Sequence, residues 1–179
     1  MNSALKSHFL VAVPQLVGPF FTKSVVLILD NDDEGSTGII LNHPTEHTLS
    51  EINESLKSSR RKKDRLFIGG PVEPSAAIII HDDTYQGPDT KPITDGVAWS
   101  ASLESMQVMS ESESLPFRCF LGYAGWTSKQ LEDEIAKGSW LLNPMNPEMI
   151  YTHQPENMWK TVLNEMGLDP LSIGPGAFD

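Results

Sequence analysis

A histidine followed directly by two aspartates, His81-Asp82-Asp83, is the best candidate for acid–base chemistry in this sequence. An imidazole titrates near neutral pH, and a neighbouring carboxylate can orient it and stabilise its charged form. A hydrolase or transferase that used His81 with Asp82 or Asp83 would also need a nucleophile or a metal ion, and we identify neither. The alternative interpretation, which the sequence favours, is a strand end that enters a polar loop.

The sequence around each possible nucleophile favours a structural role over a catalytic one. Cys119 lies among Phe117, Phe120 and Leu121, which predicts burial as a small apolar side chain rather than reactivity. A single cysteine also excludes an internal disulfide. No serine stands in a G-x-S-x-G elbow, because the stretch Gly35–Gly38 is one residue too short. We therefore assign no catalytic residue.

Two patterns resemble metal-binding motifs and depart from them. In Asp30–Gly35 the acids alternate as in a calcium loop, but Leu41 occupies the position of the closing bidentate acid. A hairpin turn with solvated acids is the better interpretation. His43 and His47 are four residues apart, but they precede an expected helix and so share no helical face. The sequence therefore predicts no metal ion and no cofactor.

Two glycine-bearing segments are the best candidates for binding. Gly69-Gly70-Pro71 follows one apolar run, and Gly122–Trp126 follows another and leads into an expected helix. Free backbone N–H groups at a helix N-terminus favour an anion or a carboxylate. We therefore expect a ligand cleft bordered by Gly69, Gly70, Pro71, Gly122, Tyr123 and Trp126. The alternative is that the two turns pack closely against each other and that Trp126 packs onto its helix.

The charge of the chain is unevenly distributed. The net charge is −11, which repels nucleic acid and anionic membranes, yet Lys57–Arg65 holds six of the thirteen basic residues. Such a stretch could contact phosphates, but it has no interleaved aromatic residue and no recognition helix. A solvated helix end is the favoured interpretation, and direct nucleic-acid binding is not expected.

Length and composition predict a single domain, residues 1–179. An apolar share of 39% is enough for a core, and no apolar run approaches the roughly 20 residues that span a bilayer. The N-terminus shows no clear signal peptide. We therefore expect a soluble cytoplasmic protein that does not bind membranes.

The apolar runs predict strands in consecutive pairs rather than a regular alternation of strands and helices. Strands are expected at Phe9–Val13, Ser24–Leu29, Gly38–Leu41, Leu66–Ile68, Ala76–His81, Val97–Trp99, Phe117–Tyr123, Trp140–Leu142 and Met149–Thr152. About four helices are expected after the caps Thr48, Ser100 or Ser102, and Thr127, and from near Pro155. This pattern favours an α+β fold with a mixed, largely antiparallel sheet.

Six sequence blocks, in this order, resemble the YqgE/AlgH family of small bacterial proteins. The blocks are FLVAVP, PFFTKSVV, STGIILN, FIGGPV, LGYAGWTSKQLEDEIAKGSWL and MWKTVLNEMG. The resemblance implies an α+β fold in which a bifurcated sheet curls into a pseudo-barrel with helices outside. The family has no established catalytic residues, so none is carried over. Asp82–Pro92 and the basic stretch match poorly and receive no role from the resemblance.

These observations favour a non-enzymatic cytosolic protein that binds a small molecule or a protein partner, a function compatible with a regulatory role. The first alternative is the hydrolase or transferase with His81. The second is a nucleic-acid-associated transcriptional regulator, a label that members of the family carry. The sequence offers no helix-turn-helix pattern to support it.

Overall fold

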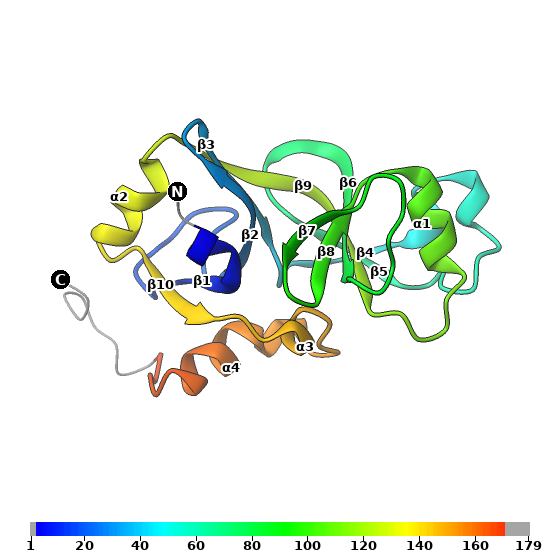
Figure 1. Cartoon of the computed structure of the whole chain (residues 1–179). Coiled ribbons are helices and arrows are strands. Elements are labelled where there is room, and N and C mark those ends of the chain that lie inside the picture. The colour runs from blue at the N-terminus through cyan, green and yellow to red at the C-terminus, as the bar shows by residue number, and fades with distance from the viewer. Residues whose placement is uncertain (1–2, 171–179) are drawn as a thin grey trace.

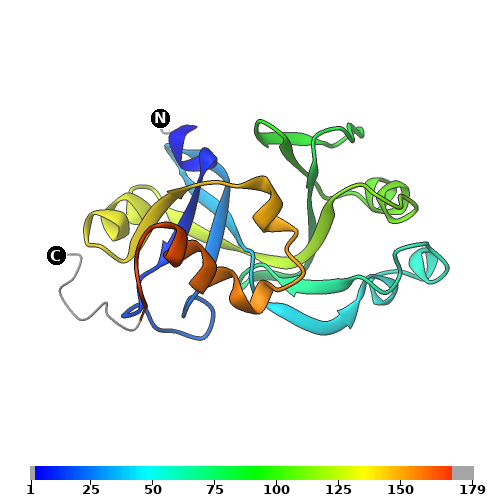
Figure 2. The same cartoon turned by 90° about the horizontal axis from the view of Figure 1, so that it is seen from below.

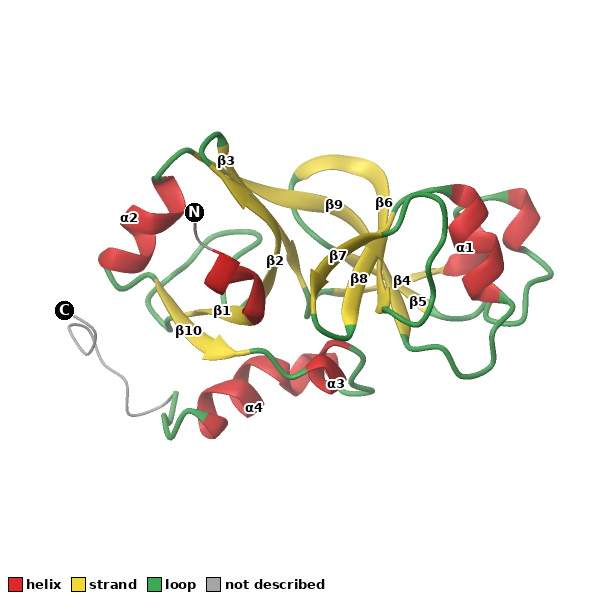
Figure 3. Cartoon of the chain, in the orientation of Figure 1, coloured by secondary structure: helices red, strands yellow, loops and turns green. Residues whose placement is uncertain are grey.

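The structure is a computed structural model that describes residues 3–170. Figure 1 shows its elements, and Figure 3 shows that strands form the centre while helices lie at the outside. The strands are β1 (His8–Ala12), β2 (Val25–Asp32), β3 (Gly35–Ile40), β4 (Pro44–Thr48), β5 (Arg65–Ile68), β6 (Val72–Asp82), β7 (Lys91–Thr94), β8 (Val97–Ser100), β9 (Phe117–Thr127) and β10 (Trp140–Pro144). The α-helices are α1 (Leu103–Ser110), α2 (Gln130–Ala136), α3 (Pro147–Ile150) and α4 (Met158–Glu165). Short 3-10 turns are η1 (Ser3–Ser7), η2 (Leu49–Glu51), η3 (Glu54–Leu56) and η4 (Pro155–Asn157).

The sheet is branched, and β9 is the strand at which it branches. Its main path runs in the order β10-β1-β2-β3-β9-β6-β8-β7, while β5 pairs with both β4 and β9. β6 pairs with β9 along Phe117–Tyr123, so β3 and β5 must share the opposite edge of β9. β3 takes the half from Ala124 to Thr127, and β5 takes Phe120 and Leu121. The pairs are antiparallel except β5 with β9, which confirms the predicted α+β fold with a largely antiparallel, bifurcated, curled sheet.

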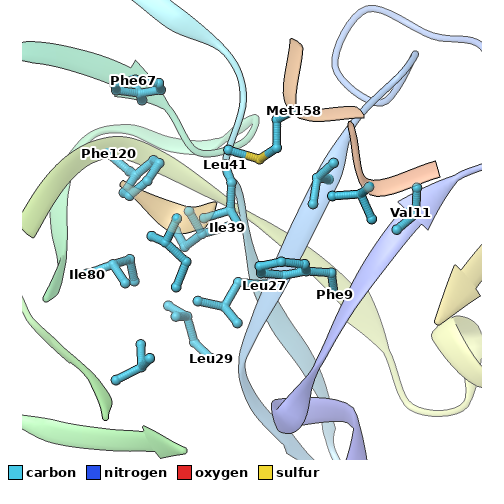
Figure 4. Close-up of a cluster of buried hydrophobic side chains, with 14 of the residues drawn as sticks. Phe9, Val11, Leu27, Leu29, Ile39, Leu41, Phe67, Ile80, Phe120 and Met158 are labelled. Carbon is cyan, nitrogen blue, oxygen red and sulfur yellow. The ribbon is translucent and has the colours of Figure 1, made fainter. Parts of the chain in front are cut away.

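Both faces of the first strands are buried, which suits their nearly continuous apolar runs. In β1, Phe9 and Val11 face the largest buried cluster, and Leu10 and Ala12 face a second one beneath α2. Figure 4 shows the largest cluster, in which residues of β1, β2 and β3 meet those of β5, β6 and β9. Figure 2 shows α3 and α4 lying across this part of the sheet. The indole N–H of Trp159 in α4 donates to the carbonyl of Ala12 at 2.8 Å.

The segment after Thr48 differs from the continuous helix that its pattern predicts. The capping box is present, since the backbone N–H of Thr48 donates to Glu51 at 2.6 Å. Two 3-10 turns follow instead of a helix. Asn53 caps the second turn by accepting from the N–H of Ser55 at 3.0 Å. A cap inside the segment begins a new turn and ends the previous one.

The predicted strand Met149–Thr152 is wrong. The chain forms the short helix α3 there, with Pro147 in its first turn. Asn146 caps this helix by accepting from the N–H of Glu148 at 3.1 Å. Proline has a φ suited to a first helical turn and asparagine satisfies a free N–H, so these two residues favour a helix over a strand.

Candidate functional site

The two glycine-bearing segments lie against each other at the branch of the sheet. The N–H of Gly69 donates to the carbonyl of Leu121 at 2.8 Å, and the carbonyl of Gly69 accepts from the N–H of Ile40 at 2.8 Å. Three residues later Val72 pairs with Tyr123 on the other edge of β9. The chain therefore passes over β9 between β5 and β6. We call residues 69–72 the crossing segment.

The crossing segment touches β9 backbone to backbone. A Cβ atom on Gly70 would lie 2.1 Å from the carbonyl carbon of Tyr123, and one on Gly69 would lie 2.4 Å from the carbonyl oxygen of Gly122. Gly122 has φ +74, and its Cβ would lie 2.4 Å from the carbonyl oxygen of Gly70. The space between the two segments is thus filled by their own backbones. A ligand role for these residues stays a prediction, and it would have to use their outer surfaces.

The geometry around Gly122–Trp126 differs from the expected turn before a helix. These residues lie inside β9, and those from Ala124 onward pair with β3, so their N–H groups do not form a helix N-terminus. Tyr123 and Trp126 also lie on opposite faces of the strand. Tyr123 packs against the largest cluster, whereas Trp126 packs into the cluster beneath α2. They do not wall one pocket, because side chains three positions apart in a strand point to opposite sides.

Glu134 of α2 holds two tryptophans of the sheet. Its Oε1 accepts from the indole N–H of Trp126 and from that of Trp140, each at 3.1 Å. The two rings are 6.3 Å apart in an edge-to-face arrangement. Trp126 is thus fixed on α2, as the structural alternative for this residue predicts.

His81 is fully buried and does not pair with the acids that follow it. Its Nε2 lies 2.8 Å from the hydroxyl of Ser100, and its Nδ1 lies 2.9 Å from the backbone carbonyl of Asp82. The carboxylates of Asp82 and Asp83 instead accept from the backbone N–H groups of Thr84 and Gly96. Burial lowers the pKa of His81. The ring and the Ser100 hydroxyl have no exposure to a substrate, so this arrangement ties strand β6 to β8.

The Cys119 thiol and the possible metal ligands show no arrangement suited to chemistry within residues 3–170. Burial raises the pKa of the Cys119 thiol to about 12, which keeps it protonated and unreactive. Within residues 3–170, no three histidines, cysteines or acids are grouped so that they could hold a metal ion. No helix in the same range is long and apolar enough to cross a membrane.

A pocket of about 550 Å³ lies where the basic stretch meets the start of β9. Three arginines line it: Arg61 and Arg65 from the basic stretch, and Arg118 from β9. Tyr151 and His153, from the chain after α3, line the same pocket. Sequence reasoning missed Arg118 and Tyr151. The available signal was a lone arginine within the otherwise apolar run that forms β9.

The three arginines that line this pocket and the neighbouring Arg60 differ in their partners. Arg61 pairs with Asp64 at 2.8 Å, and Arg60 pairs with Glu113, so both carboxylates that line the pocket are engaged. Arg65 reaches Glu156 at 3.3 Å at the surface. Arg118 has no carboxylate partner among the described residues. Its guanidinium donates to two backbone carbonyls, those of Ile150 and Thr152, each at 2.9 Å, and lies 4.4 Å from the centre of the Phe67 ring.

Arg118 has no direct ion pair with a described residue, although the charges of Asp64 and Glu156 favour its charged form from a distance. Burial lowers its pKa to about 10, and the nearby charge of Arg65 adds to this effect. The group remains charged at neutral pH. Placing a charge away from water is costly unless an opposite charge or hydrogen bonds compensate it.

The hydroxyl of Tyr151 lies in the same region. It is buried and has no hydrogen-bond partner within the described part of the chain. Burial raises its pKa, so the hydroxyl keeps its proton and can donate. A buried polar group without a partner costs about 1–3 kcal/mol.

The fold and this geometry define a small α+β protein with a branched sheet and an arginine-lined pocket. The chain belongs to the AlgH-like family, whose model matches residues 9–171. It is 37% identical to a UPF0301 protein of Myxococcus xanthus and 34% identical to one of Methylococcus capsulatus, over 96% and 94% of both chains, respectively. The solution structure of AlgH from Pseudomonas aeruginosa has a TM-score of 0.76 at 27% identity, covering 96% of this chain and 95% of that one. A Corynebacterium diphtheriae protein, DIP2367, shares the fold with a TM-score of 0.74 at 22% identity, over 89% of this chain and 85% of its own.

Proposed function

We propose that this protein is a cytosolic, non-enzymatic binding protein that takes a small anionic ligand in the arginine-lined pocket. The observation that carries the proposal is Arg118, a largely buried guanidinium without a carboxylate partner among residues 3–170. An anion would supply a direct ion pair, whereas the carboxylates of Asp64 and Glu156 act on Arg118 only from a distance. It would also meet the N–H groups of Arg61 and Arg65, which line the same pocket.

A binding role fits the surroundings better than catalysis. Cys119 lines the pocket as a protonated thiol, and His81 lies fully buried against Ser100. The basic stretch gives little support to a nucleic-acid interface. Carboxylates pair with four of its six cations: Lys57, Arg60, Arg61 and Arg65. Paired charges release few counterions when they meet a phosphate backbone, whereas a small anion in the pocket would use the N–H groups that Arg61 and Arg65 keep beside their ion pairs.

The test measures thermal stabilisation and calorimetric binding with inorganic phosphate, citrate and succinate as probes. Arg65→Gln and Arg118→Gln should each weaken the binding of the responding anion. A hydrogen bond between charged groups contributes about 1.5–3 kcal/mol, so the expected loss is about 10- to 150-fold. Lys160→Gln makes the same change of charge at an exposed position of α4 and should bind as the wild type does.

Arg118→Gln removes hydrogen bonds to two backbone carbonyls and could destabilise the fold by itself. Arg65→Gln covers this case, since Arg65 is 45% exposed and pairs with Glu156 at the surface. If none of the three anions binds, or if Arg65→Gln binds as tightly as Lys160→Gln does, the proposal is wrong.

A further inference from the structure

The arginine-lined pocket offers more donors than a single carboxylate can accept. A guanidinium has five N–H groups. Arg118 and Arg61 each use two of theirs in hydrogen bonds to described residues, and Arg65 uses one. A carboxylate brings one negative charge and two oxygens, which one arginine can satisfy. A phosphate monoester brings a charge of about −1.5 to −2 at pH 7 and three terminal oxygens.

The charge of the pocket also suits a ligand that carries more than one negative charge. Three arginines and two carboxylates line it, and both carboxylates are already paired with Arg60 and Arg61. Arg65 and Arg118 repel each other, since the charge of Arg65 disfavours the charged form of Arg118. Glu156 offsets part of this repulsion, because it pairs with Arg65 and favours the charged form of Arg118. An anion in direct contact with both guanidinium groups would offset more of it. The net charge of the whole chain is −11, so such a positive site is a local exception.

The pocket is larger than an inorganic phosphate ion needs. Its volume of about 550 Å³ lies within the range of roughly 300–1,000 Å³ found for sites that hold organic ligands. The arginines occupy part of the wall, and apolar side chains supply another part: Leu49, Phe67, Leu115, Pro116 and Phe117. Arg61 lies 3.9 Å from the centre of the Phe117 ring, so charged and apolar surfaces adjoin.

We infer that the ligand of this pocket is a phosphate monoester of a small organic molecule, with its phosphoryl group at Arg65 and Arg118 and its organic part on the apolar wall. This inference rests on the proposed anion-binding function. The net charge of the chain disfavours a phosphate within nucleic acid, so the ligand is a small molecule.

The experiment compares four probes by isothermal titration calorimetry. Phenyl phosphate carries the inferred group, phenyl sulfate has three terminal oxygens but one charge, benzoate has two oxygens and one charge, and inorganic phosphate has no organic part. Phenyl phosphate should bind at least tenfold more tightly than each of the other three. Arg65→Gln should remove most of that preference, whereas Lys160→Gln should leave it unchanged.

The outcomes separate this inference from the proposed function. If benzoate or phenyl sulfate binds as tightly as phenyl phosphate, the pocket takes anions but is not selective for phosphate monoesters, and the inference is wrong. If inorganic phosphate binds as tightly as phenyl phosphate, the organic part makes no contact, which also overturns the inference. If no probe binds and citrate and succinate also fail, the proposed function itself is wrong.

Discussion

Replacing Gly122 by alanine tests whether the sheet branches in the way that the backbone contacts indicate. Gly122 has φ +74, a left-handed conformation that costs an alanine about 1–2 kcal/mol. Its new Cβ would lie 2.4 Å from the carbonyl oxygen of Gly70 and 3.1 Å from that of Val72. Both are backbone atoms, so no side-chain rotation can relieve the contact. The crossing segment would have to move away from β9.

That movement weakens two hydrogen bonds of Gly69. Its N–H donates to Leu121 and its carbonyl accepts from Ile40, each at 2.8 Å. A net contribution of about 1 kcal/mol for each bond, added to the conformational cost, gives a destabilisation of about 3–4 kcal/mol for Gly122→Ala. Gly96→Ala is the matched control. Gly96 has φ +84 but no atom within 4 Å of its Cβ position, so it should lose only the conformational cost of about 1–2 kcal/mol.

Urea unfolding followed by far-ultraviolet circular dichroism measures these differences. With an m value of about 2 kcal/mol/M, the midpoint should fall by about 1.5–2 M for Gly122→Ala and by about 0.5–1 M for Gly96→Ala. Gly125→Ala should stay close to the wild type, because the nearest atom to its Cβ position is 4.0 Å away and its φ is not positive. If Gly122→Ala is no less stable than Gly96→Ala, the crossing segment does not touch β9 as described.

Two other predictions concern titration and the tryptophan pair. Burial lowers the pKa of His81, so the unfolded chain takes up a proton before the folded protein does, and stability falls as pH drops below about 6.5. In His81→Gln, the urea midpoint should fall less between pH 7 and pH 5 than it does in the wild type. Part of the fall should remain, since burial also lowers the pKa of His43. An unchanged dependence of the midpoint on pH would contradict the role assigned to His81. Glu134→Ala leaves two indole N–H groups without their acceptor, so the free energy of unfolding should fall by about 2–3 kcal/mol and the tryptophan fluorescence should shift. Glu132 is exposed, and Glu132→Ala should change neither quantity.

The elements that sequence patterns predicted well are those whose signals are local. The apolar run from Val25 to Leu29 and the turn after it correctly predict β2 and β3, because adjacent strands pair through a short hairpin. Of the two expected caps, Ser100 and Ser102, the second begins α1, where its hydroxyl accepts from the N–H of Ser105 at 3.1 Å. The strand predicted at Met149–Thr152 is wrong because the cap Asn146 and the first-turn residue Pro147 favour a helix there, although the residues after them are apolar.

The arginine-lined pocket could not be predicted, because its residues come from segments far apart in the sequence. The sequence pattern predicts a solvated basic stretch at Arg65, and Arg118 lies in an apolar run that predicts a buried strand. Tyr151 fell in a segment assigned to the wrong element. The long-range pairing of β5 with β9, which no local pattern specifies, brings Arg65 near Arg118. The hydrogen bonds of Arg118 to Ile150 and Thr152 then bring the segment with Tyr151 to the same pocket.

The topology of the sheet connects the glycines at the crossing segment with the arginines of the pocket. β5 pairs in parallel with β9 in the register Phe67 to Phe120, which continues to Arg65 beside Arg118 two residues earlier. Because β6 pairs with the other edge of β9, the chain must leave β5 and pass over β9, in close backbone contact at Gly69, Gly70 and Gly122. Gly122→Ala should therefore weaken anion binding together with stability, whereas Arg65→Gln should weaken binding alone. Equal anion affinity in Gly122→Ala and the wild type, measured under conditions where both are folded, would show that the pocket forms independently of the crossing segment.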